Sequence, residues 1–192
     1  MSGPVAGAPP ASWGSGSAPP AGAVVVLAAD EQSSRPVDLE RWRALALAVL
    51  EAEGLRGEVE VSLVFVDSET IAELNHRFLA RQGPTDVLAF SIDAFPIDDD
   101  PATAVGLPRL LGDVVICPEV AFRNAPEGAP HAYDDEMALL VVHGLLHLQG
   151  MDHATDADAE AMEARERELL AQLHRRADPG HADPAASPEE GL

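Results

Sequence analysis

The chain has 192 residues, of which 46% are hydrophobic, and this size and composition are typical of one globular domain with short tails. Its single cysteine excludes a disulfide framework and any zinc site built from several cysteines. The net charge is −21, from 33 acidic residues against 12 basic residues that are all arginine, which disfavours nucleic acid unless arginines cluster locally.

The two ends of the chain differ in composition from its middle. Residues 1–22 and 176–192 are rich in small residues and proline, so we expect disordered tails. Residues 23–175 are long enough to form one domain with a substantial core. The chain lacks a basic N-terminal signal segment and a long apolar run, so we expect a cytoplasmic protein without a membrane partner.

The first half of this domain alternates between strand-like and helix-like segments. Val24–Leu27 is a short β-branched run and predicts a strand. Asp38 predicts the start of a helix that runs to about Glu53 and stops at Gly54. Glu58–Val66 alternates charged and apolar residues and predicts a second strand.

The second half continues this mixture. Asp67 or Ser68 starts a helix that runs to about Ala80. Two further strands are predicted at Thr85–Ile92 and Leu110–Ile116, with a loop at 93–109 between them. Three further helices are predicted at Pro118–Ala125, Met137–Leu148 and about Asp156–His174. Met137–Leu148 is apolar nearly all round, which is typical of a buried helix. About four strands and five or so helices predict an α+β fold with a mixed sheet.

Three histidines stand at the end of the buried helix. His143 and His147 are four residues apart, so a helix places them on one face. Gly150 ends the helix, and the reversed chain can return His153 to the same place. Three imidazoles with a coordination position left for water form a catalytic type of zinc site. Burying them for packing alone would be costly, so the spacing predicts these three residues as ligands of one zinc ion.

The same spacing matches the His-Glu-x-x-His-x-x-Gly-x-x-His signature of one class of zinc proteases. Gly144 stands where that signature has its glutamate. Because the glutamate is the general base of the protease reaction, its absence argues against peptide hydrolysis by that mechanism.

Three segments in a fixed order carry a resemblance to a known family. They are Leu74-Asn75 followed by Pro84–Phe90, the strand Leu111–Ile116 with its Gly-Asp start, and His143–His153, which reads His-Gly-x-Leu-His-Leu-x-Gly-x-Asp-His. Together they resemble the bacterial YbeY family of rRNA maturation factors, and the similarity extends over about residues 24–174.

This resemblance implies a zinc-dependent endoribonuclease specific for single-stranded RNA. It implies action in ribosomal RNA processing, chiefly at the 3′ end of the small-subunit RNA, and in ribosome quality control. The implied partners are ribosomal RNA and the small ribosomal subunit with its proteins, and no DNA. The resemblance also implies His143, His147 and His153 as zinc ligands within a mixed sheet packed with helices.

The family carries an arginine after the aromatic residue of an Asn-x-x-(Tyr/Phe)-Arg segment, facing the substrate. This chain has Leu79 after Phe78. The catalytic residue is therefore left open, with Arg77 and Arg81 as candidates. The residues considered for substrate binding are Asn75, Arg77, Arg81 and Arg123, because guanidinium groups offset phosphate charge.

Two aspartates are candidates to orient the histidines. Asp152 can accept an imidazole N–H or cap the next turn. Asp113 can orient a histidine or substrate, or only fix a turn. Asp86 is expected to bond local backbone, and Cys117 to be a small core residue. We expect the remaining histidines on the surface, and they are His76, His131, His174 and His181.

Two other functions stay open on the sequence. One is a metal-dependent hydrolase of peptides or small molecules. The other is a ribosome assembly factor without enzymatic activity, in which zinc is structural and the acidic surface binds basic ribosomal proteins. For the nuclease, the sequence does not choose between attack by water and attack by the RNA 2′-OH.

Overall fold

The computed structural model describes residues 23–92, 109–127 and 131–174. The tails predicted at 1–22 and 176–192 lie outside these ranges, as does nearly all of the loop predicted at 93–109. Among the described residues, no helix has the length and apolar character that crossing a membrane requires.

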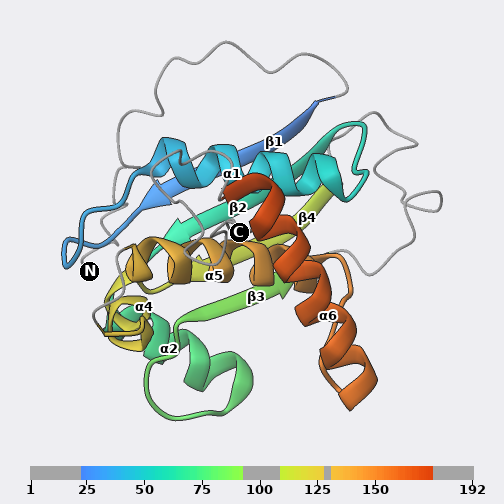
Figure 1. Ribbon diagram of the computed structural model, residues 1–192. Coiled ribbons are helices and arrows are strands. Elements are labelled where there is room, and N and C mark those ends of the chain that lie inside the picture. Colours follow the sequence, from blue (N-terminus) through green and yellow to red (C-terminus); the bar gives the residue numbers. More distant parts are fainter. Residues whose placement is uncertain (1–22, 93–108, 128–130, 175–192) are drawn as a thin grey trace, which may run out of the picture.

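Four strands form one mixed sheet in the order β1-β2-β4-β3 (Figure 1). Their bounds are Val24–Asp30 for β1, Val59–Phe65 for β2, Val87–Ser91 for β3 and Arg109–Ile116 for β4. β1, β2 and β4 are parallel, whereas β3 runs antiparallel to β4. β3 therefore forms one edge of this sheet. The predicted α+β class and the four-stranded mixed sheet are confirmed.

Five α-helices accompany the sheet within the described residues. They are α1 (Leu39–Ala52), α2 (Ser68–Leu79), α4 (Pro118–Asn124), α5 (Ala132–Leu148) and α6 (Asp156–Leu169), which continues into a π-helical turn at Leu170–His174. In Figure 1, α1 and α5 lie across one face of the sheet, and α6 packs against α5. The main core lies between these helices and the sheet. A smaller core places Ile71 of α2 against Leu88 and Val115 on the other face.

Aspartate caps begin two helices where the sequence predicts them. Asp38 accepts a hydrogen bond from the Arg41 N–H at 3.1 Å at the start of α1. Asp67, rather than Ser68, caps α2 and accepts from the Thr70 N–H at 2.8 Å. Each carboxylate accepts a hydrogen bond from a backbone N–H that has no partner within the helix. Its negative charge also interacts favourably with the positive N-terminal end of the helix dipole.

The helix α5 packs very closely on β4. A Cβ atom at Gly144 would lie 2.5 Å from Cγ1 of Val114, a distance that real Cβ atoms do not adopt. Nine residues of α5 are buried, which confirms the prediction of a buried helix. The residue after the first histidine is thus a glycine because the sheet leaves no room for a side chain.

Some predicted boundaries and one predicted environment are wrong. β1 continues past Leu27 to Asp30 because it pairs in parallel with β2 as far as Phe65. Arg109 belongs to β4 rather than to the loop, since it pairs with β2 in the parallel register. His174 was expected on the surface but is buried, with its Nε2 at 2.8 Å from Asp135 Oδ1. The fold brings α1 and α5 around it, which the local sequence does not indicate.

Candidate metal centre

His143 and His147 face each other one turn apart on α5. Their Nε2 atoms are 3.1 Å apart, and their ring planes meet at 80°. Two nitrogens that bind one tetrahedral zinc ion at about 2.0–2.1 Å lie roughly 3.3 Å from each other. The spacing of these two rings therefore matches a pair of ligands to a single ion.

His153 returns to the same place after the chain reverses at Gly150, whose φ of 89° is in the left-handed region. Its ring centroid is 5.0 Å from that of His147 and 6.0 Å from that of His143. Candidate ligand atoms of His147, Asp152 and His153 all lie within 4.8 Å of one another. The three ring centroids thus lie within 6.0 Å of one another, but His143 does not belong to the group of mutually close ligand atoms, which it reaches through its contact with His147.

Asp152 stands beside this cluster, and its hydrogen bond is to the backbone of the turn. Its Oδ1 accepts the His153 N–H at 2.7 Å, which caps the turn after Gly150. The same oxygen lies 3.3 Å from His153 Nδ1. Asp152 is exposed, so its carboxylate is accessible from the solvent as well as from the cluster.

A fourth residue of the centre comes from another helix. Glu166 of α6 is only 8% exposed, and its Oε1 lies 2.7 Å from His143 Nδ1. In the tautomer that carries its proton on Nδ1, the carboxylate accepts this N–H and the Nε2 lone pair of His143 faces His147. A cation between the two rings would then bind both of them.

Glu166 was not predicted from the sequence, although a signal was present. Met162, Glu166 and Leu169 are spaced along the buried face of α6. A charged residue inside such an apolar stripe needs a partner, because a buried carboxylate without one is costly. The sequence alone does not say that this partner is His143.

Burial lowers the pKa of His147 below its usual 6.5, and the neighbouring His143 and His153 lower it further. A hydrogen bond with the Met151 backbone acts in the opposite direction. The ring is therefore neutral near pH 7, which is the form in which an imidazole binds a metal.

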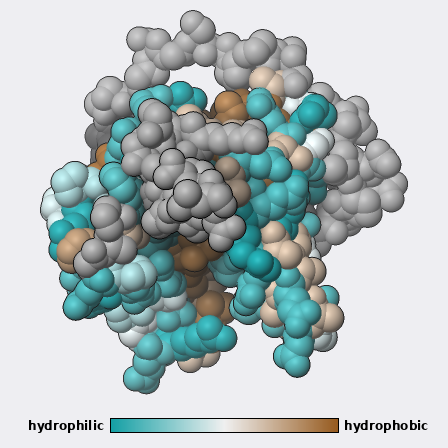
Figure 2. All heavy atoms as spheres, viewed as in Figure 1, coloured by the Kyte–Doolittle hydropathy of each residue, from teal (hydrophilic) through white to brown (hydrophobic). Residues whose placement is uncertain are grey.

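The histidine cluster opens into a groove of about 1000 Å³. One side of the groove is formed by the end of α2 and the segment that follows it, which contribute Phe78, Leu79 and Arg81. The edge strand β3 and the residues just before it line a second part from Thr85 to Ser91. Among the coloured residues of Figure 2, which has the view of Figure 1, hydrophilic residues predominate, with some hydrophobic residues visible between them.

The arginine candidates separate in space. Arg81 lines the groove, whereas the Arg77 guanidinium lies 5.3 Å from the Phe78 ring centroid and is not among the groove-lining residues. Arg123 lines a different hollow together with His131 and Tyr133. Of the three, Arg81 is therefore the one that is among the residues lining the groove of the histidine cluster.

The polar candidates have mainly structural contacts. Asn75 is buried and donates its Nδ2–H to the Gly83 carbonyl at 2.9 Å. Asp86 accepts the Val87 N–H at 2.9 Å, as expected of a residue at a strand start, and it also lines the groove. Asp113 neighbours Val114, which faces α5, so its side chain points to the opposite face of the sheet.

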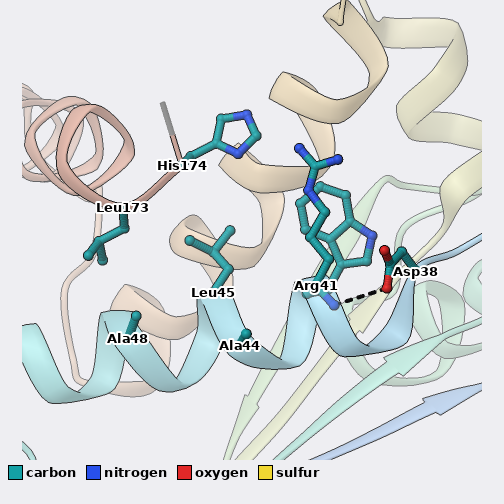
Figure 3. Close-up of a pocket in the computed structure, with 8 residues that line it drawn as sticks. Asp38, Arg41, Ala44, Leu45, Ala48, Leu173 and His174 are labelled. Carbon is teal, nitrogen blue, oxygen red and sulfur yellow. Dashed lines mark hydrogen bonds between the residues drawn. The ribbon is translucent and has the colours of Figure 1, made fainter. Parts of the chain in front are cut away.

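A second hollow of about 490 Å³ lies between α1 and the π-helical turn (Figure 3). It is lined by Arg41, Leu45 and His174 among others, and none of its lining residues belongs to the histidine groove. The His174 ring stacks on Trp42 with 6.5 Å between centroids.

Cys117 is fully buried, as predicted.

Comparison with known proteins gives consistent matches over the described domain. The sequence model of a family described as Endoribonuclease YbeY matches residues 27–174. A protein named Endoribonuclease YbeY from Salinispora tropica is 44% identical over 143 residues, which cover 73% of this chain and 90% of that protein. One of the same name from Frankia alni is 41% identical over 155 residues, 77% of this chain and 82% of its own. The solution structure of TM1509 from Thermotoga maritima matches 85% of this chain and 99% of its own with a TM-score of 0.48 and 23% identity.

Proposed function

The chain belongs to the YbeY family of endoribonucleases, and from this membership we propose that it hydrolyses phosphodiester bonds of single-stranded RNA at the histidine cluster, with one zinc ion per chain. The observation that carries the proposal is the Nε2–Nε2 distance of 3.1 Å between His143 and His147, with Glu166 fixing the first ring. His143, His147 and His153 would hold the ion, and the donor set of three imidazoles suits zinc.

A zinc ion bound there would acidify a bound water and polarise a phosphate oxygen. Glu166 keeps His143 in the tautomer that presents Nε2 to the groove. Asp152 holds the turn that carries His153. Arg81 lines the same groove and would offset the charge of a phosphate.

In the proposed reaction, a water oxygen attacks phosphorus and the bond from phosphorus to a ribose oxygen breaks. The leaving ribose oxygen takes up a proton, and the water loses one. Attack by water leaves a linear phosphate end, whereas attack by the RNA 2′-OH leaves a cyclic phosphate. Analysis of the product ends therefore identifies the nucleophile.

Peptide hydrolysis in the manner of the zinc proteases that have the same histidine spacing is the less favoured chemistry. Its general base would have to stand at position 144, where a Cβ atom would already overlap Val114. The amino acid that the reaction needs therefore has no room in this fold.

We further propose that the substrate is ribosomal RNA, at the 3′ end of the small-subunit RNA, and that the protein acts in the cytoplasm in ribosome maturation and quality control. The net charge of −21 supports a docking role for basic ribosomal proteins, because opposite charges steer the encounter. In this view the small subunit brings the RNA end to a protein that attracts free RNA poorly.

The proposal is tested by RNA cleavage together with metal content. The purified protein is expected to carry about one zinc per chain and to cut a single-stranded oligonucleotide but not its duplex. His143→Ala and His147→Ala should lose both the zinc and the cleavage. His76→Ala is the matched control, since His76 is exposed and does not line the groove. Equal cleavage by wild type and His147→Ala would contradict the proposal, and ribosome maturation supported by an inactive but folded variant would favour the assembly factor.

A further inference from the structure

Phe78 is exposed to an unusual degree for a phenylalanine. It is 55% exposed, the largest fraction among the exposed large hydrophobic residues of the described chain. It continues the apolar face of α2, on which Ile71 is buried and Leu74 packs against the smaller core. One and two turns before Phe78 this face is covered by the sheet, whereas Phe78 itself lies at the wall of the histidine groove.

The ring is held in place from behind. Phe90 of β3 meets it edge-on, with 5.0 Å between centroids and 60° between planes. The end of α2 is fixed by Ala80 in the left-handed region, with φ 53°, and by the Asn75 bond to Gly83. The Arg77 guanidinium also lies over the ring, 5.3 Å from its centroid, and more than half of the side chain stays exposed. A ring ordered in this way loses little conformational entropy when a flat group stacks on its exposed part.

The groove has little positive charge with which to bind RNA. Among its described lining residues, Arg81 is the one arginine, against the two acids Asp86 and Asp152. The whole chain carries −21, so long-range attraction to phosphates is unfavourable. Apart from the charge of the proposed zinc ion, affinity for RNA in this groove therefore has to draw on contacts that do not depend on charge.

We propose that Phe78 is a base-stacking residue, against whose exposed ring an unpaired base of the RNA in the groove packs. This inference rests on the proposed nuclease function and names how that site selects its substrate. Stacking on an aromatic ring is tolerant of sequence and needs an unstacked base. In a duplex both faces of each base are already covered, so the ring favours single strands. Leu79, 50% exposed beside it, widens the apolar contact.

The test measures binding of a labelled single-stranded RNA in chelator, so that it stays uncut, and KM and kcat with zinc. Phe78→Ala should raise Kd and KM about tenfold and leave kcat nearly unchanged. Phe78→Tyr and Phe78→Trp should bind like wild type. Phe122→Ala is the matched control, because Phe122 is 45% exposed and edge-on to another ring, but lines a different hollow.

A second arm changes the RNA instead of the protein, so it does not depend on how the variant folds. One abasic nucleotide is moved along the oligonucleotide. At one position wild type should lose about the same factor as Phe78→Ala does, and Phe78→Ala should lose nothing further. Equal Kd for wild type and Phe78→Ala, or an equal loss by both proteins on every abasic RNA, would overturn the stacking role while leaving the nuclease in place. Failure of wild type to bind or cut any single-stranded RNA would overturn both.

Discussion

Oε1 of Glu166 lies 2.7 Å from Nδ1 of His143, and the two residues come from different helices, 23 positions apart in the sequence. This contact joins α6 to α5 at the candidate metal centre. It favours the His143 tautomer with its proton on Nδ1, and Gly144, the next residue, packs on Val114 of the sheet.

Removing the acceptor at Glu166 should weaken zinc binding. We expect Glu166→Leu to lower the affinity by about 10- to 100-fold, because His143 is then free to turn or to change tautomer. Glu166→Gln should lose less, since its amide oxygen still accepts a hydrogen bond. Competition with a chromophoric chelator measures the affinity, and nitrogen chemical shifts of His143 report its tautomer. Glu163→Gln, an exposed residue on the same helix, is the control. Unchanged zinc affinity in Glu166→Leu would contradict this role.

Zinc should stabilise the folded protein. A ligand that binds only the native state at about 100 times its Kd adds roughly 2.7 kcal/mol to the free energy of unfolding. Thermal unfolding with zinc and with chelator should therefore differ by several degrees in wild type. His147→Ala and His153→Ala should show little of this difference, and His76→Ala should keep it. An equal zinc-induced rise in Tm for wild type and all three variants would show that the ion binds somewhere other than the histidine cluster.

Gly144 should tolerate no side chain. Gly144→Ala puts a methyl group 2.5 Å from Val114 Cγ1, so we expect a loss of about 1–3 kcal/mol in the free energy of unfolding from overpacking. Val114→Ala in the same protein should recover part of the loss, because it removes the clashing methyl groups. Denaturant unfolding of the two single variants and the double variant forms the test. Additive losses in the double variant would show that the contact is not the cause.

Glu136 on α5 should make stability depend on pH. Burial raises the pKa of Glu136 above its usual 4.5, and the nearby Asp86 raises it further. The folded state therefore binds this proton more tightly than the unfolded state, and stability is lost as the pH rises through the folded-state pKa. Glu136→Gln should raise the Tm at pH 7 and leave it unchanged near pH 4. The exposed Glu73→Gln serves as the control, and an equal gain at both pH values would exclude the titration as the cause.

The local parts of this protein were predictable from the sequence. Asp38 and Asp67 cap their helices because each carboxylate accepts the free N–H of the residue three positions later. This contact needs no residue from another part of the chain. The buried character of α5 follows from its composition. The approach of His143 to His147 follows from helical periodicity, and that of His153 from the turn that Gly150 permits.

The remaining features depend on contacts between segments far apart in the chain. Glu166 reaches His143 only because α6 packs back on α5. His174, expected on the surface, is buried because α1 and α5 meet around it. The order of the strands makes β3 an edge of the sheet. The groove is lined by β3 and by Arg81 from the segment before it, whereas Arg123 lines another hollow.

Short-range spacing thus set the three histidines and the helix that carries them, since backbone geometry relates neighbours in the same way in any fold. Packing of α2, α6 and the edge strand chose the partner of His143, the arginine at the groove and the exposed Phe78. These depend on which apolar faces bury one another, and no local pattern of residues encodes that choice.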